Sequence, residues 1–208
     1  MGSILFWVGA LVVFSVLSPV LKYVIAAVAG KQIGEAALAK QPDHIHLERV
    51  GPSAWKKGAG RRIVDELTSR GFVDAGIHTV PELPGIVLQL LAHTRDSFYA
   101  AVYEHPQAGT WFDLVARFQD GTSITYSTSR PTALRPRPGH PTVNLPGLDP
   151  IPVLDKAIAQ RPRRPLEAVA ADQAVRVFEQ AYTESIAFRK QQGISTEEVV
   201  KTAARKAA

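Results

Sequence analysis

The chain contains no cysteine among its 208 residues. This absence excludes a disulfide scaffold, a thiol nucleophile and any zinc or iron–sulfur site with cysteine ligands. It leaves the compartment open, because a domain without cysteine is compatible with reducing and oxidising surroundings alike.

The sequence also lacks the short motifs of several common enzyme classes. It has no G-x-S-x-G nucleophile elbow, no G-x-G-x-x-G turn and no P-loop pattern. His44 and His46 would face one side of an extended segment, but two imidazoles without a third ligand do not make a metal site. We therefore expect no metal and no cofactor, and we favour a binding protein over an enzyme.

Charge is absent from Ser3 to Leu21, and apolar side chains cover all faces of a helix in this run. A helix of this length rises about 28 Å, close to the thickness of a bilayer core. The missing basic n-region argues against a cleaved signal peptide, although residues 27–29 (AVA) keep that alternative open. The sequence predicts a transmembrane anchor over residues 1–30. Three residues are expected at the membrane interface: Lys22, Tyr23 and Trp7.

Basic residues follow the apolar run, and none precedes it. The positive-inside rule then places the N-terminus outside and the domain in the cytoplasm, with the reversed orientation as the alternative. Residues 31–58 are expected to form a juxtamembrane helix and a linker, which Pro42 and Gly51-Pro52 interrupt. The sequence thus predicts a single-pass membrane protein with a signal anchor.

Residues 59–208 are expected to form one soluble α+β domain. A helix over residues 61–70 precedes a change of period from helix to strand. Five strands are expected: 72–80, 86–93, 97–105, 111–118 and 122–128. The short connections between them favour a five-stranded antiparallel meander sheet packed by helices.

The hairpin at Asp120-Gly121 allows its register to be predicted. A two-residue turn would pair Gln119 with Thr122, whereas a three-residue loop pairs Phe118 with Thr122. Only the second register separates an apolar face from a mostly polar one. It requires Gly121 in a left-handed conformation, which glycine adopts at little cost.

Prolines recur every few residues over 129–149, which predicts an extended crossover on the surface. Asp149-Pro150 is typical of a helix start, and this helix is expected to end near Gln160. The longest soluble helix is expected over 170–192, followed by a capping box from Ser195 to Glu198.

The net charge is +5, and the basic residues are spread along the chain. Six arginines lie in the crossover or at the next break: Arg130, Arg135, Arg137, Arg161, Arg163 and Arg164. Prolines hold these segments extended, so the guanidinium groups are expected to face anionic lipid head groups or an acidic partner protein. A solvated loop without specific contacts is the alternative. No nucleic-acid partner is expected, because such a footprint is denser and interleaved with aromatics.

These observations predict a non-enzymatic binding or assembly domain, held at the lipid bilayer and partnered by another protein. The alternative is a membrane-tethered small-molecule-binding domain or hydrolase with a pocket between the sheet and the proline-rich crossover. Three histidines would supply the polar groups of that pocket: His78, His105 and His140. A pocket with converging histidines and carboxylates would favour the alternative.

Overall fold

The structure is a computed structural model that describes residues 30–131, 135–199 and 201. Its residue contacts divide the chain into two compact units. The larger unit comprises Pro42–Pro131 and Pro136–Phe188. The smaller unit comprises Met1–Gln41, Thr132–Arg135 and Arg189–Ala208. Each unit is described by itself.

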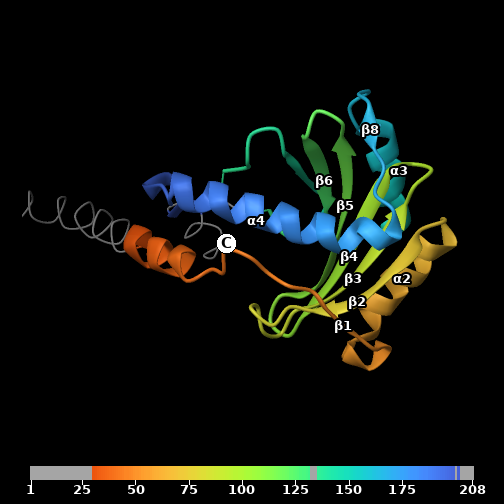
Figure 1. The fold of residues 1–208 in the computed structure, drawn as a ribbon, viewed down its shortest axis with the longest axis horizontal. Coiled ribbons are helices and arrows are strands. Elements are labelled where there is room, and N and C mark those ends of the chain that lie inside the picture. The colour runs from red at the N-terminus through yellow and green to blue at the C-terminus, as the bar shows by residue number, and fades with distance from the viewer. Residues whose placement is uncertain (1–29, 132–134, 200, 202–208) are drawn as a thin grey trace, which may run out of the picture. The chain divides into compact units, whose positions relative to one another are not determined.

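The larger unit is built on an eight-stranded sheet (Figure 1). Five antiparallel strands follow one another in chain order: β2 (Val73–Thr79), β3 (Val87–His93), β4 (Phe98–His105), β5 (Gly109–Phe118) and β6 (Ser123–Ser127). Three short strands extend this sheet: β1 (Glu48–Val50) beside β2, β7 (Thr142–Asn144) parallel to β6, and β8 (Leu166–Glu167) on β5. β8 pairs with β5 at Arg117 and Phe118, beyond the last pair that β4 makes.

The fold is α+β, but the predicted five-stranded, purely antiparallel sheet is wrong. The sheet is mixed, because β7 runs parallel to β6. Strands of two or three residues are too short for the period-2 pattern that reveals a strand in sequence. β7 also lies inside the proline-rich crossover, between Pro141 and Pro146. Its position at the edge of the sheet explains why flanking prolines are tolerated.

The register predicted for the β5–β6 hairpin is confirmed. Leu114 pairs with Tyr126 and Ala116 with Ile124, as the three-residue loop requires. The Phe118 amide donates to the Thr122 carbonyl at 2.9 Å. Gly121, at the turn, has a φ of +81°.

Helices cover both faces of the sheet in the larger unit (Figure 1). α2 (Gly58–Ser69) and α3 (Pro150–Gln160) pack on one face, and their buried side chains include Leu67 and Val153. α4 (Ala174–Gln192) begins over the other face, after the 3-10 turn η2 (Ala171–Gln173). Burying one large aliphatic or aromatic side chain contributes about 1.5–3 kcal/mol, so two apolar layers stabilise this sheet.

α3 has the predicted bounds, whereas α2 begins earlier than predicted. α3 begins at Pro150 with Asp149 as its N-cap residue and ends at Gln160, which confirms the prediction. α2 begins three residues before the predicted Arg61, at Gly58. Gly60 within this extra turn packs under the Trp55 ring, and a Cβ there would lie 2.4 Å from the ring. Only a residue without a side chain fits this position.

The described part of the smaller unit contains helical segments over 30–39 and 196–199, the helical residue 201 and the last residues of α4. The predicted capping box is confirmed: the Glu198 amide donates to Ser195 Oγ at 3.2 Å, and the Ser195 amide donates to Glu198 Oε2 at 2.8 Å. Gly193, with a φ of +67°, follows the last residue of α4.

Among the described residues, no helix is long and apolar enough to cross a membrane. The longest, α4, has 19 residues and carries charged side chains such as Glu179, Glu184 and Arg189. The structure thus gives no support to the predicted single-pass membrane protein with a cytoplasmic domain, and that prediction is not retained. The predicted span 1–30, apart from Gly30, and its interface residues Lys22, Tyr23 and Trp7 lie outside the described residues.

Candidate functional site

The three histidines predicted to line a pocket lie apart. His78 is buried on β2, and His105 ends β4, two strands away. His140 lies on the crossover, where its Nδ1 is 2.8 Å from Ser123 Oγ. The structure thus brings no two of these histidines into one site.

His78 and His140 are both held in surroundings that disfavour the charged imidazole. Burial, followed by the charge of Arg49, lowers the pKa of His78, and its Nδ1 has no hydrogen-bond partner. Burial, followed by the charge of Arg137, lowers the pKa of His140. These shifts favour neutral rings that pack against the sheet.

His44 and His46 fasten the segment before β1 and do not form a metal site. His46 Nδ1 is 2.6 Å from Glu82 Oε1, and His44 Nδ1 is 3.2 Å from Thr183 Oγ1 on α4. No three His, Asp or Glu side chains in the described part of the chain are arranged to hold a metal ion.

Four of the six predicted contact arginines have partners within their own unit. Arg130 and Arg163 have no hydrogen bond or ion pair with the residues that the structure describes. The paired ones are Arg135 with Glu197, Arg137 with Glu184, Arg161 with the backbone carbonyl of Asp96, and Arg164 with Asp120. The paired arginines therefore hold segments of the fold together, and the expected free basic surface is reduced.

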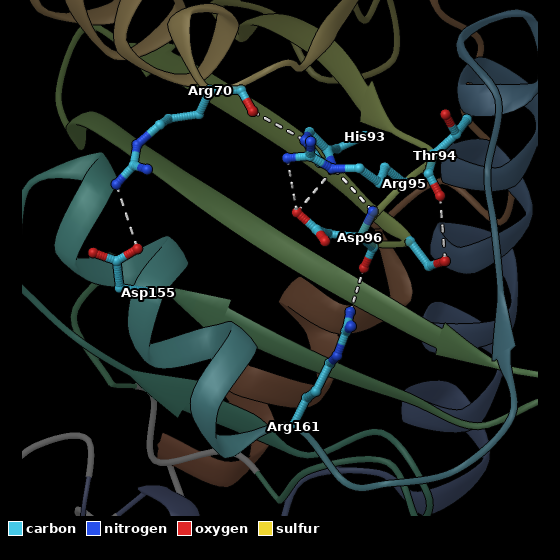
Figure 2. A network of polar contacts seen from close by, with 8 residues as sticks. Arg70, His93, Thr94, Arg95, Asp96, Asp155 and Arg161 are labelled. Carbon is cyan, nitrogen blue, oxygen red and sulfur yellow. Dashed lines mark hydrogen bonds and ion pairs between the residues drawn. The ribbon is translucent and has the colours of Figure 1, made fainter.

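A buried histidine that the sequence analysis did not single out joins the β3–β4 turn to the end of α2 (Figure 2). His93 is 3% exposed. Its Nε2 lies 3.0 Å from the Arg70 carbonyl, and its Nδ1 accepts the Asp96 amide at 3.1 Å. Both ring nitrogens are therefore occupied, which identifies His93 as a structural residue with no free atom for proton transfer.

A pocket of about 550 Å³ lies at the opposite end of the strands, between the β4–β5 turn and the proline-rich crossover. We call it the crossover pocket. Its lining includes Ala108, Thr110, Trp111, Ser129 and Arg130. None of the three histidines that the alternative prediction named for a pocket near the crossover belongs to this lining.

Two local features shape the crossover pocket. His105 Nδ1 accepts the amides of Gln107 and Ala108, both at 3.2 Å, and so holds the β4–β5 turn. The Trp111 ring stacks on the Tyr103 ring at 4.8 Å between centroids, with an interplanar angle of 12°. Of the three predicted histidines, only His105 contacts residues of the pocket lining, Gln107 and Ala108, and it does not belong to the lining itself.

The pocket offers two kinds of contact to a ligand. Trp111 supplies an aromatic face, and Arg130 supplies an exposed guanidinium. Thr110 also lines the pocket, but its Oγ1 is buried and has no hydrogen-bond partner.

Hydroxyl groups connect the crossover pocket to a shielded carboxylate. Ser129 Oγ lies 2.7 Å from Ser127 Oγ, which is buried. Ser127 stands directly opposite Asp113 in the β5–β6 ladder. Asp113 keeps some exposed surface, but its Oδ1 is buried and has no hydrogen-bond partner.

The surroundings of Asp113 disfavour its charge. Burial raises the pKa of Asp113 from 3.8 to about 6, although hydrogen bonds from Ser127 and Tyr103 oppose the rise. Burial, followed by the charge of Asp113, raises the pKa of Tyr103 well above its usual range. The Tyr103 hydroxyl therefore stays protonated as a donor, and Asp113 exchanges its proton near pH 6.

In the predicted register, Asp113 lies on the mostly polar face of the hairpin, where it would be expected to contact solvent. α4 approaches this face instead, and its Phe178 ring lies 6.2 Å from the Tyr103 ring. A carboxylate in mid-strand opposite a serine was the signal available in the sequence. Its importance was missed because burial of that face depends on a helix some 60 residues further along the chain.

Comparisons with protein-family models, with curated proteins and with solved structures found no match. The function is therefore inferred from the crossover pocket and the groups around it.

Proposed function

We propose that the larger unit is a binding domain that takes a small ligand in the crossover pocket. The ligand carries an anionic group, which Arg130 attracts, and a flat apolar part, which lies on Trp111. The observation that carries this proposal is the combination of an exposed, unpaired Arg130 with the Trp111 ring in the lining of one pocket.

The size and the lining of the pocket support this proposal. A volume of about 550 Å³ lies within the range of small-molecule sites. Mixed polar and aromatic lining is also typical of such sites.

Binding is favoured over hydrolysis because the pocket lining contains hydroxyls but no imidazole among the described residues. A serine or threonine nucleophile needs a base within hydrogen-bond reach. Asp113 reaches the pocket only through two serine hydroxyls, and one of these, Ser127, is itself buried. This arrangement suits a site that senses or holds a ligand.

The absence of cysteine makes a direct test possible. The variant Ala108→Cys places a single thiol at the pocket, and Ser185→Cys places one on the exposed side of α4 as a control. Both proteins are incubated with a library of disulfide-bearing fragments and analysed by intact mass spectrometry. Aromatic carboxylates and phosphates should be captured at Ala108→Cys and not at Ser185→Cys.

A second substitution distinguishes capture that depends on the pocket from the general reactivity of the introduced thiol. Arg130→Ala in the Ala108→Cys background should reduce capture of the anionic fragments and leave neutral fragments unaffected. Equal capture of the same fragments at the two cysteines would refute the proposal, as would anionic capture that does not depend on Arg130.

A further inference from the structure

We propose that the segment Arg161–Pro165 forms a second site, which binds a tetrahedral oxyanion of the phosphate type. This site is separate from the crossover pocket and does not depend on the function proposed for it. We call it the arginine hook.

The arginine hook lines a surface depression of about 620 Å³. Arg161, Arg163 and Arg164 contribute to its wall, together with Ile158 and the prolines of the segment. No carboxylate belongs to this lining. Three guanidinium groups around one depression produce a positive potential that attracts an anion.

Two of the three guanidinium groups are held in place by the sheet. The Arg164 guanidinium lies 4.0 Å from the centroid of the Phe118 ring, and its Nη1 donates to Asp120 Oδ2 at 2.9 Å. The Arg161 guanidinium lies 4.9 Å from the Phe98 ring centroid. Figure 2 shows its Nη1 donating to the Asp96 carbonyl. These contacts fix the guanidinium groups before any ligand arrives, which lowers the entropic cost of binding.

The fixed arginines keep donors free for a ligand. A guanidinium has five N–H groups, and the hydrogen bonds from Arg161 to Asp96 and from Arg164 to Asp120 use one each. Asp120 offsets one positive charge, because its carboxylate pairs with Arg164. Hydrogen bonds from Thr122, and after them the charge of Arg164, lower the pKa of Asp120. The Asp120–Arg164 pair therefore stays charged at neutral pH.

Arg163 is the unpaired member of the hook. Its side chain is exposed and has no partner among the described residues. Pro162 and Pro165 restrict the backbone on either side, which limits the positions that Arg163 samples. An oxyanion with three or four oxygens can accept hydrogen bonds from all three arginines, whereas a planar carboxylate pairs with one or two.

The full chain is titrated calorimetrically with three probes at low ionic strength: sulfate, inorganic phosphate and phosphoserine. The structure predicts saturable binding of all three, and weakening by added salt. Tighter binding of phosphoserine would identify a phosphorylated side chain as the natural ligand type. Equal or tighter binding of inorganic phosphate would identify a free ion.

Two variants and a control localise the binding. Arg163→Ala should weaken binding about tenfold, the effect of one charge-assisted hydrogen bond. Arg163→Lys should restore only part of the affinity, because an ammonium lacks the planar fork. Arg176→Ala removes an exposed arginine on α4 and should leave the affinity unchanged.

The absence of saturable binding by all three probes would overturn the proposal. Equal losses in Arg163→Ala and Arg176→Ala would also overturn it, because they would indicate a general effect of net charge. Capture of fragments at Ala108→Cys involves other residues, so either proposal can fail while the other stands.

Discussion

Asp113 is the residue whose surroundings conflict most clearly with its charge. It lies in the middle of β5, beside the aromatic residues Tyr103 and Tyr99, and one of its oxygens is buried without a partner. An arrangement that costs stability at neutral pH is a common feature of functional sites. Ser127 and Ser129 connect this carboxyl group to the crossover pocket, which is the proposed binding site.

The raised pKa of Asp113 predicts a definite dependence of stability on pH. Between pH 3.8 and about 6 the folded chain binds more protons at this group than the unfolded chain, so stability falls as pH rises. A rise from 3.8 to about 6 corresponds to ~3 kcal/mol. Asp113→Asn should therefore increase the free energy of unfolding at pH 7 by ~1–3 kcal/mol.

Urea denaturation at pH 4 and pH 7 measures this effect. The gain from Asp113→Asn should be present at pH 7 and largely absent at pH 4, where the wild-type carboxyl is protonated. Asp65→Asn on the exposed face of α2 is the matched control and should show no such difference. A loss of stability at pH 7 in Asp113→Asn would contradict the prediction.

At the scale of single elements, the β5–β6 hairpin depends on the chemistry of its turn. Asp120 Oδ1 accepts the Thr122 amide at 2.9 Å, and Gly121 adopts the left-handed conformation. No atom lies within 4 Å of a Cβ built on Gly121. Conformation alone, without any clash, therefore favours glycine at this position.

Gly121→Ala should lower the free energy of unfolding by ~1 kcal/mol, because alanine disfavours a positive φ. Gly58→Ala is the matched control: nothing lies within 4 Å of its Cβ either, but its position at the start of α2 is helical. Alanine is a better helix former than glycine, so this change should be neutral or stabilising. Thermal unfolding of the two variants measures the direction of each stability change. Equal changes in stability would disprove the conformational explanation.

At the scale of the larger unit, one sheet separates two apolar layers. Leu90 and Leu91 are consecutive residues of β3, both fully buried, and they face opposite layers. Trp55 belongs to the layer under α2, while Trp111 stacks with Tyr103 on the side of α4. Because both layers share the same strands, we expect them to unfold together.

Leu90→Ala and Leu91→Ala should each cost about 2–5 kcal/mol, as is usual for a fully buried leucine. Two variants are made in which Trp55 or Trp111 is the only tryptophan. Their midpoints of urea unfolding, measured by tryptophan fluorescence, should coincide. Either leucine variant should then shift both midpoints by the same amount. Midpoints that separate in one variant would indicate two independently stable layers.

Features that depend on a few neighbouring residues could be predicted from the sequence. The hairpin register followed from the alternation of β5 and β6 around Gly121, and the bounds of α3 followed from Asp149-Pro150. The capping box at Ser195 depended on residues only three positions apart. In each case the side chains that decide the structure lie within one turn or one hairpin.

Features that depend on distant segments could not be predicted. β8 forms because β4 leaves the edge of β5 free at Arg117 and Phe118, which nothing near Leu166 indicates. The ion pairs that Arg137 and Arg164 make with Glu184 and Asp120 were not predicted. The acidic partners of these two arginines lie more than 40 positions away in the chain.

Periodicity, proline positions and turn glycines act within a few residues, so they are enough to set the five long strands, the β5–β6 register and the bounds of α3. The approach of α4 to the polar face of the hairpin, and the burial of Asp113 that follows from it, depend on how distant segments pack in the folded chain. This packing therefore decides the surroundings of Asp113. It also decided that the crossover closes a pocket over Trp111 and Ser129. Burial depends on which distant segments meet, and no short stretch of sequence carries that information.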